Sequence, residues 1–103
     1  MSVLLEFAMF PTDKGTSVSK YVSQIIEMIR ESGHAYKLTA MGTIVETDTM
    51  EDALAVVNNS YKILEPHSER VYSSLNFDIQ KNKNNRLIGK VESIESKIGE
   101  VNK

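Results

Sequence analysis

The sequence predicts an α+β fold: a ferredoxin-like, split βαββαβ antiparallel sheet with an extra C-terminal helix. Two observations predict it. Hydrophobic residues alternate with polar ones or form short β-prone runs in four segments, and they recur at helical spacing in three others. These segments follow one another as strand, helix, strand, strand, helix, strand, helix. A chain of 103 residues has the length of one domain, so we expect residues 1–103 to form a single domain.

Four strands are expected, and they cover residues 3–10, 35–40, 43–48 and 70–80. The first is an apolar, β-prone run that is interrupted by Glu6 and ended by Pro11. Ala40 and Met41 separate the second strand from the third, and Gly42, which can adopt a positive φ, favours a hairpin there. The fourth strand alternates throughout, and one of its sides consists of Val71, Ser73, Leu75, Phe77 and Ile79.

Three amphipathic helices are expected, over residues 17–32, 49–65 and 86–99. Ser17 is a suitable N-cap for the first helix, and Gly33 can supply the left-handed residue that ends it. Asp48 is the expected N-cap of the second helix, with Glu51 three positions later as in a capping box. The third helix has a narrow apolar stripe that can pack on its own sheet or on another subunit: Leu87, Val91, Ile94, Ile98 and Val101.

The composition limits the compartment and the partners. A net charge of −2 and a pI of about 5.7 argue against nucleic-acid binding, which requires a surplus of Lys and Arg on one face. The absence of cysteine excludes disulfides and thiolate chemistry and fits a reducing compartment. Residues 1–10 lack the basic region of a signal peptide, and no apolar run approaches the ~20 residues of a membrane span. We therefore expect a cytoplasmic protein that binds neither nucleic acid nor membrane.

No sequence motif indicates catalysis or a bound cofactor. The chain contains no G-x-S-x-G, P-loop or G-x-G-x-x-G pattern, and no spacing of His and carboxylates that predicts a metal site. His34 and His67 lie at helix-to-strand junctions, where the helix dipole favours them as structural residues. We expect a protein without enzymatic activity, cofactor or metal. Two alternatives stay open: a small enzyme that uses Glu46 or His67 as acid or base, and a purely structural oligomerisation module.

Glu46 is the most informative residue of the chain. It alternates with Ile44 in the third strand, so both side chains point to the same face of the sheet. If Ile44 faces the helices, Glu46 is a half-buried carboxylate, which is costly without a partner. In one interpretation Glu46 is instead solvated, or it meets a basic side chain. In the other, Glu46 lines a pocket and accepts a hydrogen bond from a ligand. Glu6 in the first strand poses the same question.

Several segments of the chain resemble a known family. They are Gly15–Val18, Tyr21–Val22, Ser32–Gly33 and Arg70–Val71, together with Tyr36–Glu46, in which Met-Gly-Thr is followed by a carboxylate. Over roughly residues 2–100, the chain resembles the small thiamine-binding proteins. The resemblance implies a ferredoxin-like fold, and dimers with facing sheets that pair further into tetramers. It also implies binding of thiamine or its hydroxymethylpyrimidine half, without catalysis.

A pocket for an aminopyrimidine needs apolar walls and a few placed polar groups, because the ring is flat and carries donors and acceptors on its edge. A carboxylate and hydroxyls can bind the edge, while aromatic and Met side chains, which are also common in cores, can flank the faces. The residues expected to bind the ligand are Glu46, Thr43, Ser17, Tyr36, Met41 and Tyr21. Such a protein would serve as a carrier, a buffer or a sensor.

The order of the elements also predicts assembly, because helices in this order cover only one face of the sheet. Residues such as Val45 would then be exposed on the other face, and large apolar patches on monomers are uncommon. We therefore expect a symmetric homo-oligomer, at least a dimer and more readily a tetramer, with part of the third helix's stripe between subunits.

Overall fold

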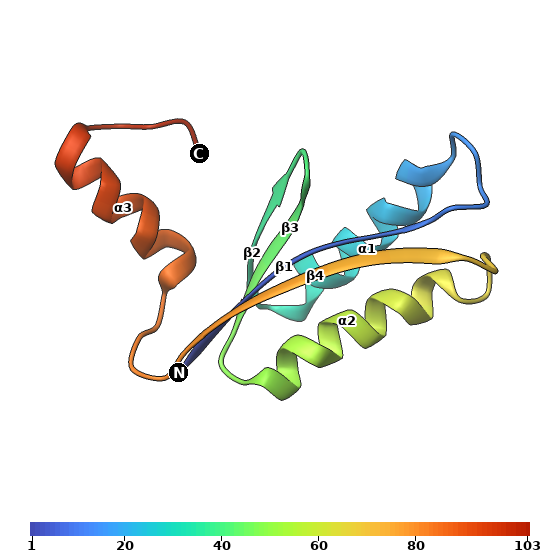
Figure 1. Ribbon diagram of the computed structural model, residues 1–103, viewed down its shortest axis with the longest axis horizontal. Coiled ribbons are helices and arrows are strands. Elements are labelled where there is room, and N and C mark those ends of the chain that lie inside the picture. The colour runs from blue at the N-terminus through green and yellow to red at the C-terminus, as the bar shows by residue number, and fades with distance from the viewer.

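The computed structural model describes residues 1–103, and its elements follow the predicted order. They are β1 (Ser2–Pro11), α1 (Val18–Ser32), β2 (Ala35–Thr39), β3 (Gly42–Thr47), α2 (Met50–Leu64), β4 (Val71–Gln80) and α3 (Arg86–Ile98). The four strands form one antiparallel sheet in the order β2-β3-β1-β4 (Figure 1). The predicted ferredoxin-like fold with an extra C-terminal helix is therefore confirmed.

The sheet combines a long ribbon with a short hairpin. β4 pairs with β1 along its whole length, from Ser2–Gln80 to Pro11–Val71, whereas β3 pairs with β1 only over residues 3–7. In Figure 1, α1 and α2 run along the ribbon, and α3 stands apart from them, beyond the hairpin. The chain thus places two helices on one face of the sheet and the third helix elsewhere.

The hydrophobic core lies between the sheet and the helices α1 and α2. Its members come from β1, β3 and both helices, and they are Leu5, Phe7, Met9, Ile25, Ile29, Val45, Val56 and Leu64. Fully burying a side chain of this kind stabilises the fold by about 1.5–3 kcal/mol. Val45 is 0% exposed, so the expectation that it is exposed on the other face of the sheet is wrong. The odd-numbered residues of β3 face the helices instead.

We call the face of the sheet that points away from α1 and α2 the open face. In the β1–β3 register, Val45 lies opposite the core residue Leu5, which places the neighbouring pairs Ile44–Glu6 and Glu46–Leu4 on the open face. Ile44 therefore does not face the helices α1 and α2, and the condition that would bury Glu46 beneath them is not met.

Gly42 is required for a reason other than the one predicted. It does not have a positive φ. A Cβ added to Gly42 would lie 2.9 Å from the backbone oxygen of Phe7, which is closer than a side chain can approach. Glycine at this position therefore permits the close approach of the hairpin to β1.

The helix ends agree with the sequence only in part. Gly33 ends α1 with a φ of 85°, as predicted, but Ser17 makes no side-chain capping bond. The N-cap of α2 is Thr49 rather than Asp48: Thr49 Oγ1 accepts a hydrogen bond of 3.1 Å from the N–H of Asp52. None of the helices combines the length and the apolar character that crossing a bilayer requires.

Candidate functional site

The Glu46 carboxylate lies at the N-terminus of α3 and accepts three hydrogen bonds. Its Oε1 accepts from the backbone N–H of Leu87 at 3.0 Å, and its Oε2 accepts from the N–H of Arg86 at 2.9 Å and from Ser2 Oγ at 2.5 Å. The first N–H groups of a helix have no partner within the helix, and an anion beside them is favoured by the helix dipole. Glu46 therefore caps α3 from a different part of the chain.

Two opposing effects act on the pKa of Glu46. Burial raises this pKa, but the hydrogen bonds from Ser2, Leu87 and Arg86, and the positive charge of Arg86, together outweigh it. The pKa is therefore held below its ordinary value, and the carboxylate is charged at neutral pH. Glu46 thus has partners within the chain, which are the Ser2 hydroxyl and two backbone N–H groups rather than a basic side chain; contact with a ligand stays a prediction.

The Arg86 side chain fastens the first turn of α3 to both long strands. It is only 4% exposed. Its Nε donates to Ser2 Oγ at 3.1 Å, and its Nη2 donates to the backbone oxygens of Ser2 at 2.8 Å and Asp78 at 2.5 Å. Its Nη1 lies 3.0 Å from the Asp78 carboxylate, which also accepts from Lys90 at 3.2 Å. The start of α3 is thus fixed relative to β1, β3 and β4.

Four of the six residues predicted to bind the ligand lie toward the hairpin tip and the start of α1. Thr43 and Met41 line an apolar slot of about 250 Å³ between β1, α1 and the hairpin. Ser17 precedes α1 and is exposed. Tyr21 is half-buried, and its ring centroid lies 5.5 Å from that of His67. Only Thr43 and Met41 therefore share a cavity.

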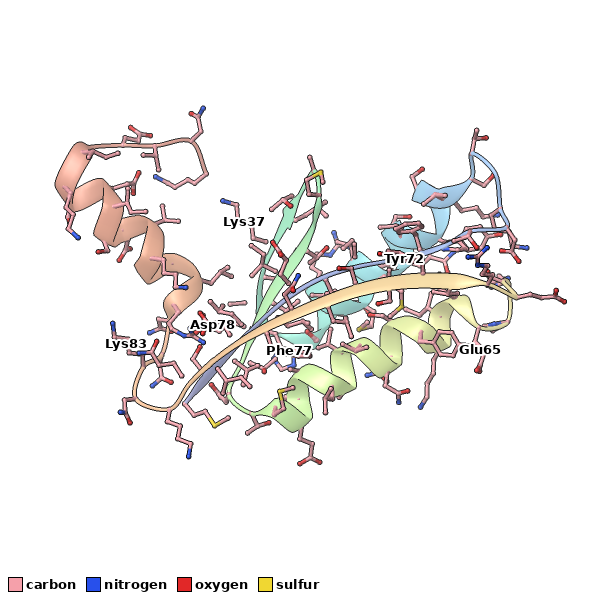
Figure 2. The ribbon with its side chains drawn as sticks, in the orientation of Figure 1. Lys37, Glu65, Tyr72, Phe77, Asp78 and Lys83 are labelled. Carbon is pink, nitrogen blue, oxygen red and sulfur yellow. The ribbon has the colours of Figure 1, made fainter.

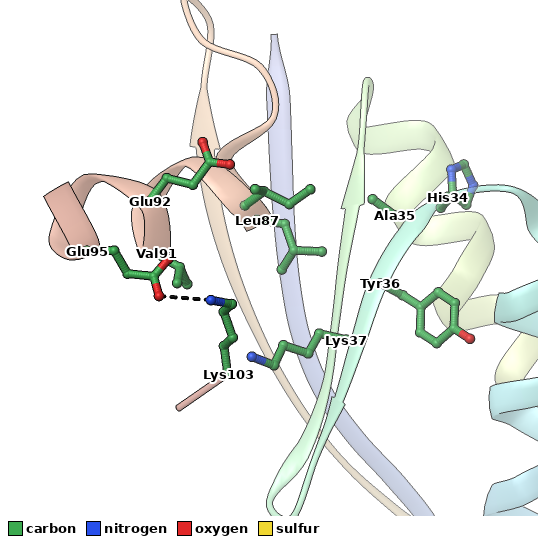
Figure 3. Close-up of a pocket in the computed structure, with 10 residues that line it drawn as sticks. His34, Ala35, Tyr36, Lys37, Leu87, Val91, Glu92, Glu95 and Lys103 are labelled. Atoms are coloured by element: carbon green, nitrogen blue, oxygen red, sulfur yellow. Dashed lines mark hydrogen bonds and ion pairs between the residues drawn. The ribbon is translucent and has the colours of Figure 1, made fainter. Parts of the chain in front are cut away.

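The other two predicted residues lie elsewhere. Glu46 borders a small polar cavity of about 210 Å³ at the opposite end of β3. Tyr36 lies on β2, and its ring points toward the helices α1 and α2 (Figure 3). The six predicted residues are consequently not gathered in one site by the fold.

A larger cavity of about 440 Å³ lies between the open face and α3. The apolar residues that line it come from β1, β3, β4 and α3, and they are Leu4, Ile44, Phe77, Leu87 and Val91. Figure 2 labels Phe77 together with two of the polar lining residues, Lys37 and Asp78. Its polar side chains are Glu6, Lys37, Thr39, Asn76, Asp78, Arg86 and Lys90. Because Glu46 and Arg86 hold the first turn of α3 in place, they also hold the wall that Leu87 and Val91 contribute.

A row of four residues crosses the whole sheet inside this cavity. Lys37 of β2 pairs with Ile44 of β3, Ile44 pairs with Glu6 of β1, and Glu6 pairs with Asn76 of β4. Adjacent members of such a row lie roughly 5 Å apart. The side chains of Lys37, Glu6 and Asn76 make no hydrogen bond or ion pair within the chain, unlike Asp78, Arg86 and Lys90. The open face therefore presents an amine, a carboxylate and an amide that are available to a ligand.

Lys37 also belongs to a neighbouring groove between β2 and α3, with a volume of about 570 Å³. Figure 3 shows its side chain reaching from β2 toward α3 and the Lys103 side chain. Across the groove, Lys103 Nζ donates to Glu95 at 2.8 Å. The open-face cavity thus continues past Lys37 along the edge of the sheet.

Glu46 and His67 do not form an acid–base pair. Glu46 lies opposite Leu4, near the start of β1. The loop that contains His67 lies beside the other end of β1, where the N–H of Thr12 donates to Arg70 O at 2.9 Å. The eight positions between Leu4 and Thr12 correspond to roughly 26 Å of strand. An enzyme that combines these two residues in one active site is therefore not supported.

Sequence reasoning did not single out Lys37, Asn76 or the buried Arg86. Alternation along β4 did place Asn76 on a polar side, but only the pairing of strands brings it next to Glu6. Arg86 belongs to a run of Lys, Asn and Arg residues that is typical of a solvated loop. The missing information was the register between strands that are distant in the sequence.

The fold and the site define a ferredoxin-like α+β protein with a ligand-sized cavity on its open face. Residues 5–95 match the thiamine-binding protein family, and the chain belongs to this family. The resemblance found in the sequence is thus confirmed, and membership gives the protein a thiamine-related role.

Relatives and solved structures agree with this assignment. A UPF0045 protein of Methanothermobacter thermautotrophicus is 31% identical over 84 residues, which cover 81% of this chain and 85% of the relative. The UPF0045 protein MJ1052 of Methanocaldococcus jannaschii is 34% identical over 92 residues, covering 89% and 91%. Its crystal structure superimposes with a TM-score of 0.78 over 90% of this chain and 95% of that one. A candidate thiamine biosynthesis/salvage protein of Thermotoga maritima, at 20% identity, shares the fold with a TM-score of 0.77 over 91% and 99%.

Proposed function

We propose that this protein binds thiamine, or its hydroxymethylpyrimidine half, in the open-face cavity without catalysing a reaction, and serves as a carrier, buffer or sensor. The proposal rests on the unpaired carboxylate of Glu6. Its carboxylate stands between Ile44 and Asn76 with no partner in the chain. A carboxylate beside apolar side chains is stabilised when a cationic or hydrogen-bond-donating ligand arrives.

The chemistry of the ligand matches the row of side chains. Thiamine combines an aminopyrimidine ring with a positively charged thiazolium ring. Glu6 can accept from the exocyclic amino group, and the amide of Asn76 can donate to one ring nitrogen while its oxygen accepts elsewhere. Leu4 and Ile44 offer an apolar surface for one face of the ring, and Val91 of α3 lies above it. The positive thiazolium ring is attracted to the same carboxylate.

In this proposal Glu46 does not bind the ligand itself but holds α3 in position. It holds the N–H of Leu87, and Leu87 lines the cavity. The slot lined by Thr43 and Met41 is the alternative place for the ring, because it is apolar and Thr43 Oγ1 has no partner within the chain. Titration of the Glu6→Gln and Thr43→Val variants distinguishes the two locations.

We further propose that the open face is covered by the open face of a second copy, and that the subunits form a dimer or tetramer. The support is apolar exposure outside the core: on α3, Ile94 and Ile98 are exposed, and Tyr72 is exposed on the open face, where it packs against Phe10. A second copy would enclose the cavity and exclude water from the ligand, which strengthens a charge-assisted hydrogen bond.

The test is calorimetric titration of the full chain with thiamine and with hydroxymethylpyrimidine. Glu6→Gln keeps the shape but removes the charge, and we expect it to weaken binding roughly ten- to a hundredfold. Glu31→Gln, at an exposed position of α1, is the matched control and should bind like the parent. Thr43→Val keeps the size of the side chain and should also bind like the parent.

Other outcomes have definite meanings. If Thr43→Val weakens binding and Glu6→Gln does not, the ligand occupies the slot between β1 and α1. If the parent binds neither compound, the binding proposal fails and a structural oligomerisation module replaces it. If NMR spectra show that bound thiamine is converted to a product, the protein is an enzyme, and the proposal of binding without catalysis fails.

A further inference from the structure

On the basis of the function proposed above, we further propose that the ligand is the phosphate monoester of thiamine, and that Lys37 binds its phosphate. An aminopyrimidine ring between Glu6 and Asn76 makes no contact with Lys37, which lies at the other end of the same row of paired residues. The Lys37 amine therefore lacks an anionic partner that neither the chain nor the pyrimidine ring supplies.

Lys37 is the unpaired cation of the open-face cavity. The cavity is lined by three cationic side chains, which are Lys37, Arg86 and Lys90. The Asp78 carboxylate lies 3.0 Å from Nη1 of Arg86 and 3.2 Å from Nζ of Lys90, so it offsets much of their charge. Lys37 is half-buried and forms no ion pair. An anion that enters the cavity is consequently attracted most strongly to Lys37.

The groove between β2 and α3 also leaves Lys37 free. Its second amine, Lys103 Nζ, donates to Glu95 at 2.8 Å. The other carboxylate of the groove, Glu92, is exposed on α3 and points away from both amines in Figure 3. The amine of Lys37 thus lies where the cavity and the groove meet, with room for a group larger than a hydroxyl.

The two unpaired charges of the row have opposite signs and are separated by an apolar residue. Lys37 pairs with Ile44, and Ile44 pairs with Glu6. Because neighbouring strands are about 4.8 Å apart, the backbone positions of Lys37 and Glu6 are roughly 10 Å apart. The row is therefore complementary to a ligand with a cationic or donor-rich end, an apolar middle and an anionic end.

Thiamine phosphate carries its groups in this order. The aminopyrimidine lies at one end, the thiazolium ring is in the middle, and the phosphate is attached to the hydroxyethyl arm at the other end. When the aminopyrimidine binds Glu6 and Asn76, the thiazolium ring lies over Ile44 and the phosphate reaches Lys37. A phosphate monoester carries a charge of about −1.5 to −2 at pH 7, so it binds an amine more strongly than the free hydroxyl of thiamine does.

Hydroxymethylpyrimidine phosphate has a different arrangement of the same groups. Its phosphate is attached through a single carbon next to the ring carbon that bears the amino group. A molecule this short cannot extend from Glu6 to Lys37, and its phosphate would lie near the Glu6 carboxylate, which repels it. We therefore expect the cavity to select the phosphate ester of the complete vitamin.

The test is calorimetric titration of the full chain with thiamine, hydroxymethylpyrimidine and the phosphate monoester of each. We expect the parent to bind thiamine phosphate roughly tenfold more tightly than thiamine. It should bind the shorter ester no more tightly than hydroxymethylpyrimidine itself. Lys37→Gln should remove the tenfold preference for thiamine phosphate and change the affinity for thiamine by less than about twofold.

Two further variants test whether the charge at this position is responsible. Lys37→Arg keeps a positive group at the same place and should retain the preference for thiamine phosphate. Lys62→Gln removes a positive charge at an exposed position of α2 and should bind all compounds like the parent.

The remaining outcomes separate the role of Lys37 from the proposed function. Equal affinity of the parent for thiamine and its phosphate overturns the role of Lys37 and leaves the binding of thiamine intact, whereas binding of neither contradicts both. A preference that is lost in Lys90→Gln but kept in Lys37→Gln places the phosphate beside Asp78, and equal weakening of both compounds by Lys37→Gln also overturns the assignment. A gain in affinity for the shorter ester alone contradicts the spacing between Glu6 and Lys37.

Discussion

The backbone N–H of Leu87 lies 3.0 Å from the carboxylate of Glu46, although 41 positions separate the two residues. This contact, together with the buried Arg86, attaches the first turn of α3 to the sheet. The later turns of α3 are held less firmly, since Ile94 and Ile98 are exposed. The position of α3, and with it one wall of the open-face cavity, therefore depends on two carboxylates, Glu46 and Asp78, and on the Arg86 guanidinium.

Replacing Glu46 by Gln should loosen α3. The amide oxygen keeps one acceptor, but the NH2 group cannot accept from a second backbone N–H, and the charge that faces the helix dipole is lost. We expect unfolding in urea to show a loss of about 1–3 kcal/mol. Hydrogen exchange of the Leu87 amide should accelerate more than that of Ile25 in the core. Glu31→Gln should leave both measurements unchanged, and equal acceleration of both amides would contradict a local role for Glu46.

Stability should fall at acidic pH because two anchoring carboxylates have lowered pKa values. The pKa of Asp78 is lowered by the hydrogen bond from Lys90 and by the charge of Arg86, and the pKa of Glu46 is lowered as described above. A folded-state pKa below the unfolded one gives stability that is present above the unfolded pKa, about 4, and is lost as pH falls through the folded pKa. Urea unfolding at a series of pH values from 7 to 3 should show this loss. Glu46→Gln should show a smaller loss over that range, and an identical profile would contradict the assignment.

Two glycine substitutions should have opposite effects. In Gly42→Ala, the new methyl group would lie 2.9 Å from the Phe7 oxygen, so the hairpin must shift, and we expect a loss of about 1–3 kcal/mol. Gly89 lies within α3 and has nothing within 4 Å of the added methyl group. Gly89→Ala should therefore increase stability by up to about 1 kcal/mol, because alanine is the better helix former. Thermal unfolding of both variants measures the difference, and a stable Gly42→Ala protein would mean that the strands do not approach this closely.

The cap of α2 distinguishes two adjacent residues. Thr49→Ala removes the oxygen that accepts from Asp52 N–H, and we expect it to cost about 1 kcal/mol in urea unfolding. Asp48→Ala removes no capping bond and should change stability by less than about 0.5 kcal/mol. The opposite ranking would restore Asp48 as the N-cap.

Periodicity in the sequence was sufficient for the fold, and every helix and strand lies within two residues of its expected range. It was not sufficient for the orientation of β3. That strand carries apolar residues on both sides, Ile44 on one and Val45 on the other, and its buried neighbours Thr43 and Thr47 are polar. The pattern of β3 alone therefore does not tell which side meets the helices, and only its pairing with the strongly amphipathic β1 decides it.

The candidate site was less predictable than the fold. The row of Lys37, Ile44, Glu6 and Asn76 takes one residue from each strand, and a register shift of one position in any pair would disperse it. The role of Glu46 depends likewise on where α3 begins in space. Contacts between segments that are distant along the chain do not produce a characteristic spacing of residues, so the sequence alone does not predict them.

The position of β1 has a consequence for how the chain folds during synthesis. Its first residues depend on the latest elements: Ser2 is 1% exposed because it binds Glu46 and Arg86, and β4 covers one whole edge of the strand. While the ribosome translates the middle of the chain, the apolar residues of β1 are already made but lack a partner on that edge. Long-range pairing of this kind slows folding and leaves hydrophobic segments open to aggregation. β1, the central strand of the core, is thus synthesised first but pairs with β4 only late in synthesis. Nascent chains that stop before Val71 should therefore depend on chaperones to stay in solution.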